Sequence, residues 1–155
     1  MIVGLFGTCG DSEWRAEFIN EYRRRGIEFF NPNITLQTHG RAWDVSDTKN
    51  ETHHLFTDKV IVLVVTDETF GTASLAEAML CVALAALEPK RHFILMIDRI
   101  VVSRLVTMNP QAAKESNNAR AIVRRHLSQL LNKKIPNLHI AENLEQALRI
   151  SLEIC

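Results

Sequence analysis

The chain has 155 residues, 46% of them hydrophobic, and its 18 basic side chains are balanced by 18 acidic ones. This length fits one domain, 1–155, with a core of its own, and the lack of a net positive charge argues against a nucleic-acid partner. The longest apolar stretch, residues 78–87, is too short to cross a membrane. Three cysteines at unrelated spacings and an N-terminus without a signal peptide predict a cytoplasmic protein.

Apolar runs alternate with stretches of helical periodicity along the whole chain. In order, a strand is expected at 2–6, a helix between Trp14 and Gly26, a strand at 27–30, a loop at 33–46, a helix at 47–57, a strand at 60–65, a helix at 74–87, a strand at 92–97, a helix at 117–131, a strand at 138–140 and a helix at 144–154. The run 60–65 is apolar at every position, which is typical of a central parallel strand. The alternation predicts a Rossmann-like α/β fold, a five-stranded parallel sheet with helices on both faces.

Functional sites in such sheets lie beyond the carboxyl ends of the strands, here in the loops 7–13, 31–46, 66–73 and 98–118. The most informative of these loops follows the central strand and leads to Glu77. We expect Glu77 in the first turn of its helix, where free N–H groups and the helix dipole favour an ionised carboxylate. An ionised carboxylate that faces a cleft can attack a sugar carbon.

A purely structural role for Glu77 competes with this one. Ser74-Leu75-Ala76-Glu77 matches the capping-box pattern, in which the glutamate only accepts a hydrogen bond from the N-cap backbone. On pattern alone the cap is the more common case.

Short motifs between residues 7 and 77 follow one another as they do in a known enzyme family. They are Gly7-Thr8-Cys9, Ser12-Glu13-Trp14-Arg15, Phe30-Asn31-Pro32, Trp43, Glu51, Val65-Thr66, Gly71 and Ser74-Leu75-Ala76-Glu77. In this order the set resembles the nucleoside 2-deoxyribosyltransferase-like family. The resemblance implies a flavodoxin-like fold that acts on 2′-deoxynucleosides and free nucleobases by a retaining double displacement. Neither a cofactor nor a metal is expected.

The resemblance also implies roles for individual side chains. Glu77 would be the nucleophile, and Glu51 would give the departing base its proton. Trp43 would offer a stacking face to the base, or else pack under its loop. Asp44 would hydrogen-bond a base edge, or only its own turn. The remaining expected substrate contacts are Gly7, Thr69, Gly71 and Ser74.

Two positions depart from the family pattern. Many members have a tyrosine in the first strand, where this chain has Leu5. Members also complete the pocket with an asparagine from a neighbouring subunit, for which the chain offers Asn117 or Asn118. The nearly all-apolar helix 74–87 agrees with a homo-oligomer, since a surplus apolar face commonly marks a subunit interface.

Other constellations are weaker. Cys9 and Arg15 match the C-x5-R pattern of a low-molecular-weight tyrosine phosphatase, but Asp11 and Glu13 place negative charge where a phosphate would sit. No metal-binding, dinucleotide or Walker A motif is present.

Two alternatives to the transferase remain open. One is a hydrolase of 2′-deoxynucleoside 5′-monophosphates, with the phosphate at the loop containing Thr69, Gly71, Thr72 and Ser74. The other is a non-catalytic nucleotide sensor on the same fold. No arginine adjoins that loop in the sequence, so free nucleosides are the expected substrates.

Overall fold

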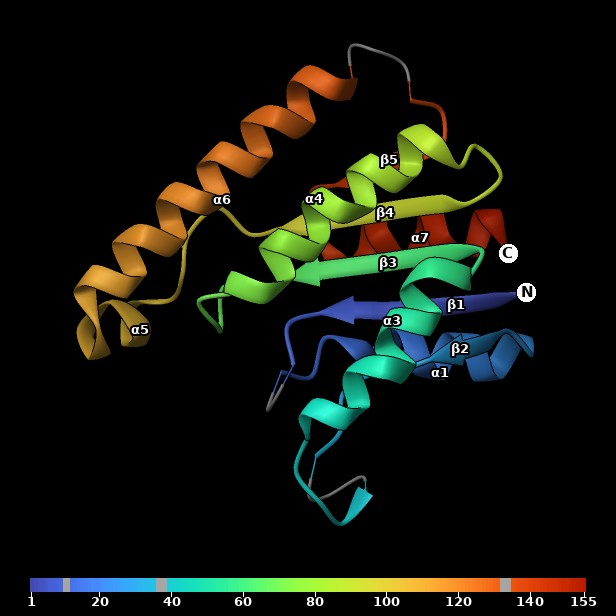
Figure 1. Cartoon of the computed structure of the whole chain (residues 1–155), viewed down its shortest axis with the longest axis horizontal. Coiled ribbons are helices and arrows are strands. Elements are labelled where there is room, and N and C mark those ends of the chain that lie inside the picture. Colours follow the sequence, from blue (N-terminus) through green and yellow to red (C-terminus); the bar gives the residue numbers. More distant parts are fainter. Residues whose placement is uncertain (10–11, 36–38, 132–134) are drawn as a thin grey trace.

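The computed structural model describes residues 1–9, 12–35, 39–131 and 135–155. Its centre is a parallel sheet of five strands: β1 (Ile2–Gly7), β2 (Glu28–Phe30), β3 (Val60–Val65), β4 (His92–Ile97) and β5 (Leu138–Ala141). The strands lie in the order β2-β1-β3-β4-β5 (Figure 1). The predicted flavodoxin-like α/β fold is therefore confirmed, since this strand order is that of flavodoxin.

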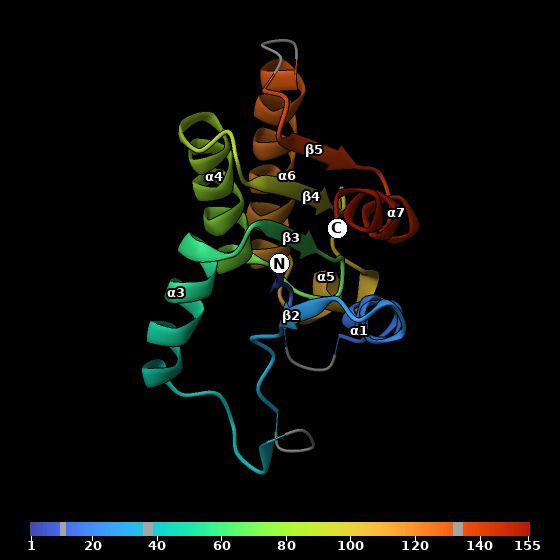
Figure 2. The same cartoon turned by 90° about the vertical axis from the view of Figure 1, so that its right-hand side faces the viewer.

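Helices cover both faces of the sheet. Figure 2 shows α1 (Arg15–Arg25) and α7 (Leu144–Ile154) on one face, and α3 (Thr48–Thr57), α4 (Thr72–Leu87) and α6 (Pro110–Leu131) on the other. A short 3₁₀ helix, η1 (Val45–Asp47), precedes α3, and α5 (Ser103–Met108) precedes α6. None of the helices in the described ranges is long and apolar enough to cross a membrane.

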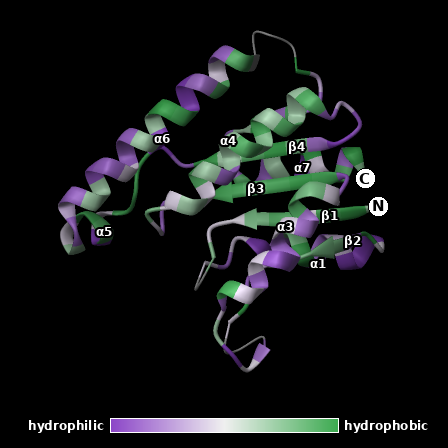
Figure 3. Ribbon diagram, in the orientation of Figure 1, coloured by the Kyte–Doolittle hydropathy of each residue, from purple (hydrophilic) through white to green (hydrophobic). Residues whose placement is uncertain are grey.

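The core has two layers because side chains alternate across β3. Ile61, Leu63 and Val65 join the cluster beneath α4 and α6, whereas the intervening valines face α1 and α7. All six residues of β3 are buried, as the unbroken apolar run predicted. Figure 3 shows the same hydrophobic centre, with the hydrophilic colour gathered on the outer helices.

The region 98–118 differs from its prediction as a loop. It contains α5, and α6 begins at Pro110 rather than at residue 117. Val101, Leu105 and Ala113 form a small core of their own with Phe70. Proline is favoured at the first position of a helix, where its missing N–H is not needed. The sequence signal was missed because α5 has only six residues, too few to show a helical period.

Candidate active site

A pocket of about 480 Å³ opens at the carboxyl ends of β1 and β3. The strand order reverses between these two neighbours, and ligands bind at such switch points. The pocket is lined by Gly7, Thr8, Cys9, Pro32, Asn33, Ile34, Trp43, Glu51, Thr69, Gly71, Thr72, Ala73, Ser74 and Glu77. Seven of the residues expected from the sequence therefore meet in one cavity: Gly7, Trp43, Glu51, Thr69, Gly71, Ser74 and Glu77.

Glu77 lies in the second turn of α4, because the helix begins at Thr72. Its N-cap is Gly71, which has no side chain to cap with. The capping box is therefore wrong as an explanation for Glu77, and so is its expected place in the first turn. Instead the side chain is half-buried against the pocket, and no described residue forms a hydrogen bond with it.

The surroundings of Glu77 disfavour its charge. Burial raises the pKa of its carboxyl, the neighbouring negative charge of Glu51 raises it further, and the cation of Arg15 lowers it only in part. The expectation that the helix terminus keeps Glu77 ionised is therefore corrected. Burial and the charge of Glu51 both destabilise the ionised form of Glu77, so its carboxylate is more reactive once it has lost its proton.

Glu51 reaches the pocket from the first turn of α3. The indole N–H of Trp43 donates a hydrogen bond of 2.7 Å to its Oε1. Trp43 itself is 47% exposed and lines the pocket, so it does not serve as core packing under the loop.

Asp44 has the second of its two expected roles. Its carboxylate accepts a hydrogen bond from the Ser46 N–H at 2.9 Å and caps η1, and the residue does not line the pocket. Asp44 therefore stabilises the conformation of its own loop and does not contact a ligand in the pocket.

Only glycine fits at position 7. The backbone there has φ of 111°, and a Cβ would lie 1.9 Å from the carbonyl oxygen of Val64. This close approach lets the Thr8 N–H donate to the same oxygen at 2.8 Å. The Thr8 hydroxyl in turn accepts from the Thr66 N–H at 3.0 Å, so the loops after β1 and β3 are joined directly.

Arg15 stabilises the end of β1 and the loop that follows it. It is buried, and its guanidinium donates to the carbonyl oxygens of Leu5 at 3.0 Å and Thr8 at 2.5 Å. A phosphatase arginine would have to face the bound phosphate instead. Burial also raises the pKa of the Cys9 thiol more than Arg15 lowers it, although the residue stays partly exposed. Both observations argue against the C-x5-R phosphatase.

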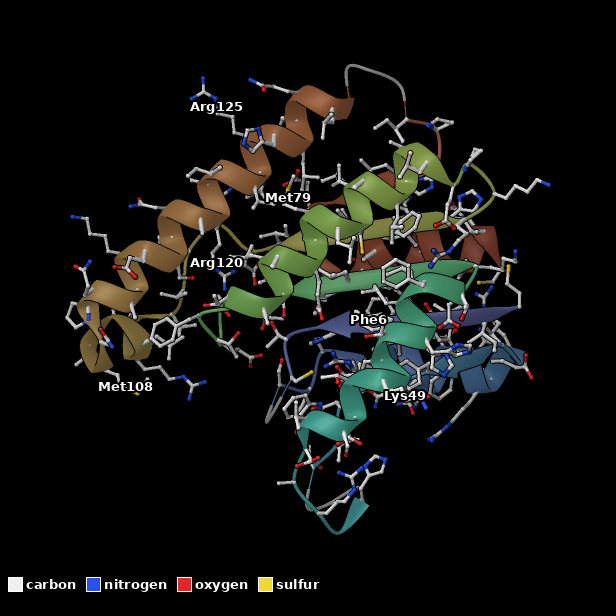
Figure 4. The ribbon with its side chains drawn as sticks, in the orientation of Figure 1. Phe6, Lys49, Met79, Met108, Arg120 and Arg125 are labelled. Atoms are coloured by element: carbon white, nitrogen blue, oxygen red, sulfur yellow. The ribbon has the colours of Figure 1, made fainter. Side chains whose placement is uncertain are left out.

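The loop after β3 is held by a residue that the sequence analysis did not single out. Arg120, on α6, is fully buried. Its guanidinium donates to the carbonyl oxygens of Thr66 at 2.9 Å, Thr69 at 2.7 Å and Asp98 at 3.1 Å. Figure 4 shows Arg120 directed inward toward the start of α4. Gly71 leaves room for it, since a Cβ there would lie 3.2 Å from Nη2 of Arg120.

The start of α4 offers free donors to the pocket. The N–H groups of Thr72, Ala73 and Ser74 precede the first helical hydrogen bond, that from the Leu75 N–H. Ser74 is 8% exposed, and its hydroxyl forms no hydrogen bond with a described residue.

Although no arginine adjoins this loop in the sequence, two arginines lie beside it in the folded chain. Besides Arg120, Arg104 of α5 lies beside it, with Nη2 at 3.4 Å from the Glu68 carbonyl oxygen. Arg104 is exposed and forms no ion pair within the described part of the chain. Both arginines lie far from the loop in sequence, so only the folded chain shows them there.

The expected asparagines do not reach this pocket. Asn117 accepts a hydrogen bond from the Val101 N–H at 2.9 Å and so fixes the link between β4 and α5. Asn118 is exposed on α6, outside the pocket lining, and its contribution to a neighbouring subunit stays a prediction. Leu5 is fully buried in the core that faces α1 and α7.

No protein-family model matches the chain, and neither a curated protein nor a solved structure does. Among the described residues, no group of three or more histidine, cysteine, aspartate or glutamate side chains is arranged to hold a metal ion.

Proposed function

We propose that the protein is a nucleoside 2-deoxyribosyltransferase, which moves the deoxyribosyl group of a 2′-deoxynucleoside from one base to another. One observation carries the proposal: two carboxylates, Glu77 and Glu51, face the same pocket from two different helices. Retaining glycosyl transfer needs such a pair, one as nucleophile and one as acid and base. The volume of about 480 Å³ is within the range of small-molecule sites.

In the first half-reaction a carboxylate oxygen of Glu77 forms a bond to C1′. The bond from C1′ to the base nitrogen breaks, its electron pair stays with the base, and Glu51 supplies a proton to the base. In the second half-reaction a nitrogen of another base attacks C1′, the bond to Glu77 breaks, and Glu51 takes up the proton that the incoming base loses. Two inversions at C1′ restore its configuration.

Of the two carboxylates, Glu77 is the better candidate for the nucleophile. Its carboxylate has no hydrogen-bond partner among the described residues, whereas one oxygen of Glu51 accepts from Trp43. A nucleophile needs a free lone pair, and an acid–base residue needs a fixed position.

The test is base exchange with deoxyinosine as donor and adenine as acceptor, followed by chromatography for deoxyadenosine. Glu77→Gln should reduce exchange by several orders of magnitude, as the loss of a covalent nucleophile does. Glu145→Gln, an exposed carboxylate on α7, is the matched control and should retain exchange. Near wild-type exchange by Glu77→Gln would contradict the proposal. If the wild-type protein binds nucleosides but releases no base, the non-catalytic sensor is favoured.

A second candidate is a 2′-deoxynucleoside 5′-monophosphate N-glycosidase. The free N–H groups at the start of α4, the Ser74 hydroxyl and the nearby Arg104 favour it, since together they are donors suited to a phosphate. The two candidates are separated by comparing deoxyadenosine with its 5′-monophosphate. Release of deoxyribose 5-phosphate without base exchange would identify the hydrolase.

A further inference from the structure

Trp43 has a polar contact that its stacking role does not need. The residue lies in the loop between β2 and α3, and its Nε1 is 2.7 Å from Oε1 of Glu51. An indole that is 47% exposed can hydrogen-bond to water at no cost. Here its N–H is instead directed to one of the two carboxylates of the site.

The loop holds the indole in this place. Arg41 forms two hydrogen bonds to the carboxylate of Asp47, at 2.6 and 2.8 Å. The other end of the same turn is tied by the Asp44 N–H, which donates to Asp47 Oδ2 at 2.9 Å. Trp43 lies between Arg41 and Asp44 in sequence, so the loop is anchored to Asp47 on both sides of the indole, directly before α3.

We infer that Trp43 is a positioning residue for Glu51, and that its N–H selects which carboxylate oxygen exchanges the proton with the base. This inference rests on the proposed function. A protonated carboxyl group accepts hydrogen bonds best on its carbonyl oxygen. The indole at Oε1 therefore directs the proton to Oε2, which becomes the oxygen that donates to the departing base and accepts from the incoming one.

The indole thus contributes through its ring and through its N–H, and the two contributions are separable. Phenylalanine at position 43 keeps an aromatic face for the base but removes the donor. Alanine removes both. A role in stacking alone predicts that Trp43→Phe behaves like wild type, whereas the positioning role predicts a loss.

The first experiment observes the hydrogen bond without any substrate. The two tryptophans give two indole N–H signals in a ¹⁵N-correlated NMR spectrum, and Trp14 is an internal reference because its Nε1 donates to the Thr8 carbonyl oxygen in the core. Glu51→Gln should move the Trp43 signal upfield and leave that of Trp14 in place.

Val45→Ala is the matched control, since Val45 is an exposed apolar residue of the same loop that does not line the pocket. It should move neither indole signal. A Trp43 signal that Glu51→Gln leaves in place would overturn the inference. Because this experiment needs no turnover, it separates failure of the inference from failure of the proposed function.

The second experiment is kinetic. Trp43→Phe should lower kcat for deoxyadenosine by about 10- to 100-fold, the range that small misplacements of a catalytic group cause, with little change in KM. With 7-methyl-2′-deoxyguanosine, whose base leaves without a proton, kcat should change less than about threefold. In a Glu51→Gln background, Trp43→Phe should cause no further loss. Equal losses on both nucleosides, or losses that multiply in the double variant, would overturn the inference.

Discussion

Replacing Arg120 with methionine should destabilise the protein and inactivate the site from a distance. The arginine is fully buried on α6, and among the described residues that line the pocket it forms a hydrogen bond only with Thr69, through its backbone oxygen. Methionine has similar length and fills most of the same volume without any donor. The variant therefore tests the hydrogen bonds of the guanidinium more than its packing.

The magnitude follows from the carbonyl oxygens left behind. Of the acceptors of Arg120, Val65 keeps a second donor in the Asp98 N–H at 2.9 Å. Thr69 and Asp98 are only partly buried, so water can replace the arginine there. The Thr66 oxygen is buried and loses its donor, at a cost of about 1–3 kcal/mol. With a smaller loss at the other two oxygens, we expect about 2–4 kcal/mol in the free energy of unfolding.

The assay is thermal and urea unfolding followed by circular dichroism. For a domain of this size the expected loss lowers Tm by about 5–15 °C. Arg125→Met is the control, since Arg125 is exposed on the same helix and points outward in Figure 4; its Tm should stay within about 2 °C of wild type. A change that small in Arg120→Met would refute the reasoning, because the hydrogen bonds would then contribute nothing net.

Other expectations concern the pocket and its surface. Because the pKa of Glu77 is raised in the folded state, its ionisation destabilises the fold; Glu77→Gln should therefore raise Tm at pH 7, and the gain should vanish below the ordinary carboxyl pKa of about 4.3. An equal gain at both pH values would contradict this assignment of its cause. Gly7→Ala should destabilise by more than about 3 kcal/mol, whereas Gly26→Ala, also at positive φ but in open space, should cost about 1 kcal/mol in chemical denaturation. Under the proposed function, Trp43→Ala should release more free deoxyribose and form less exchanged nucleoside than wild type, measured with a fixed donor at each of several rising concentrations of acceptor base. A ratio equal to that of wild type would show that the indole does not exclude water. Light scattering should give the mass of a homo-oligomer, since α4 is apolar on nearly every face and its surplus apolar surface would be covered by a second copy. A fully active monomer at micromolar concentration would count against this expectation.

The fold was predictable because its signals are local. The central strand β3 is an unbroken apolar run, and the predicted strand at 92–97 coincides with β4. The alternation of strands and helices leaves few topologies open, since crossovers between parallel strands are right-handed. The missed α5 has six residues and little periodicity, so nothing local distinguished it from the loop around it.

The site was predictable in part, for a related reason. Glu77 follows the central strand closely, so its place near the carboxyl edge of the sheet could be predicted from the elements, whereas Glu51 was expected only from the family resemblance. The contact between Trp43 and Glu51 depends on how the loop turns, which the anchoring of Arg41 on Asp47 decides. A buried arginine resembles a surface arginine in sequence, so Arg120 carried no signal.

All the residues that line the pocket lie between Gly7 and Glu77, yet the loop among them is held by Arg120. This separation in sequence has a consequence for synthesis on the ribosome, where the chain emerges from its N-terminus. A nascent chain that has reached the end of α4 already has every lining side chain, but not the helix that holds the loop. Competence to bind should therefore arise late, when α6 docks, and release of the chain before that point would leave the carboxylates without their arrangement.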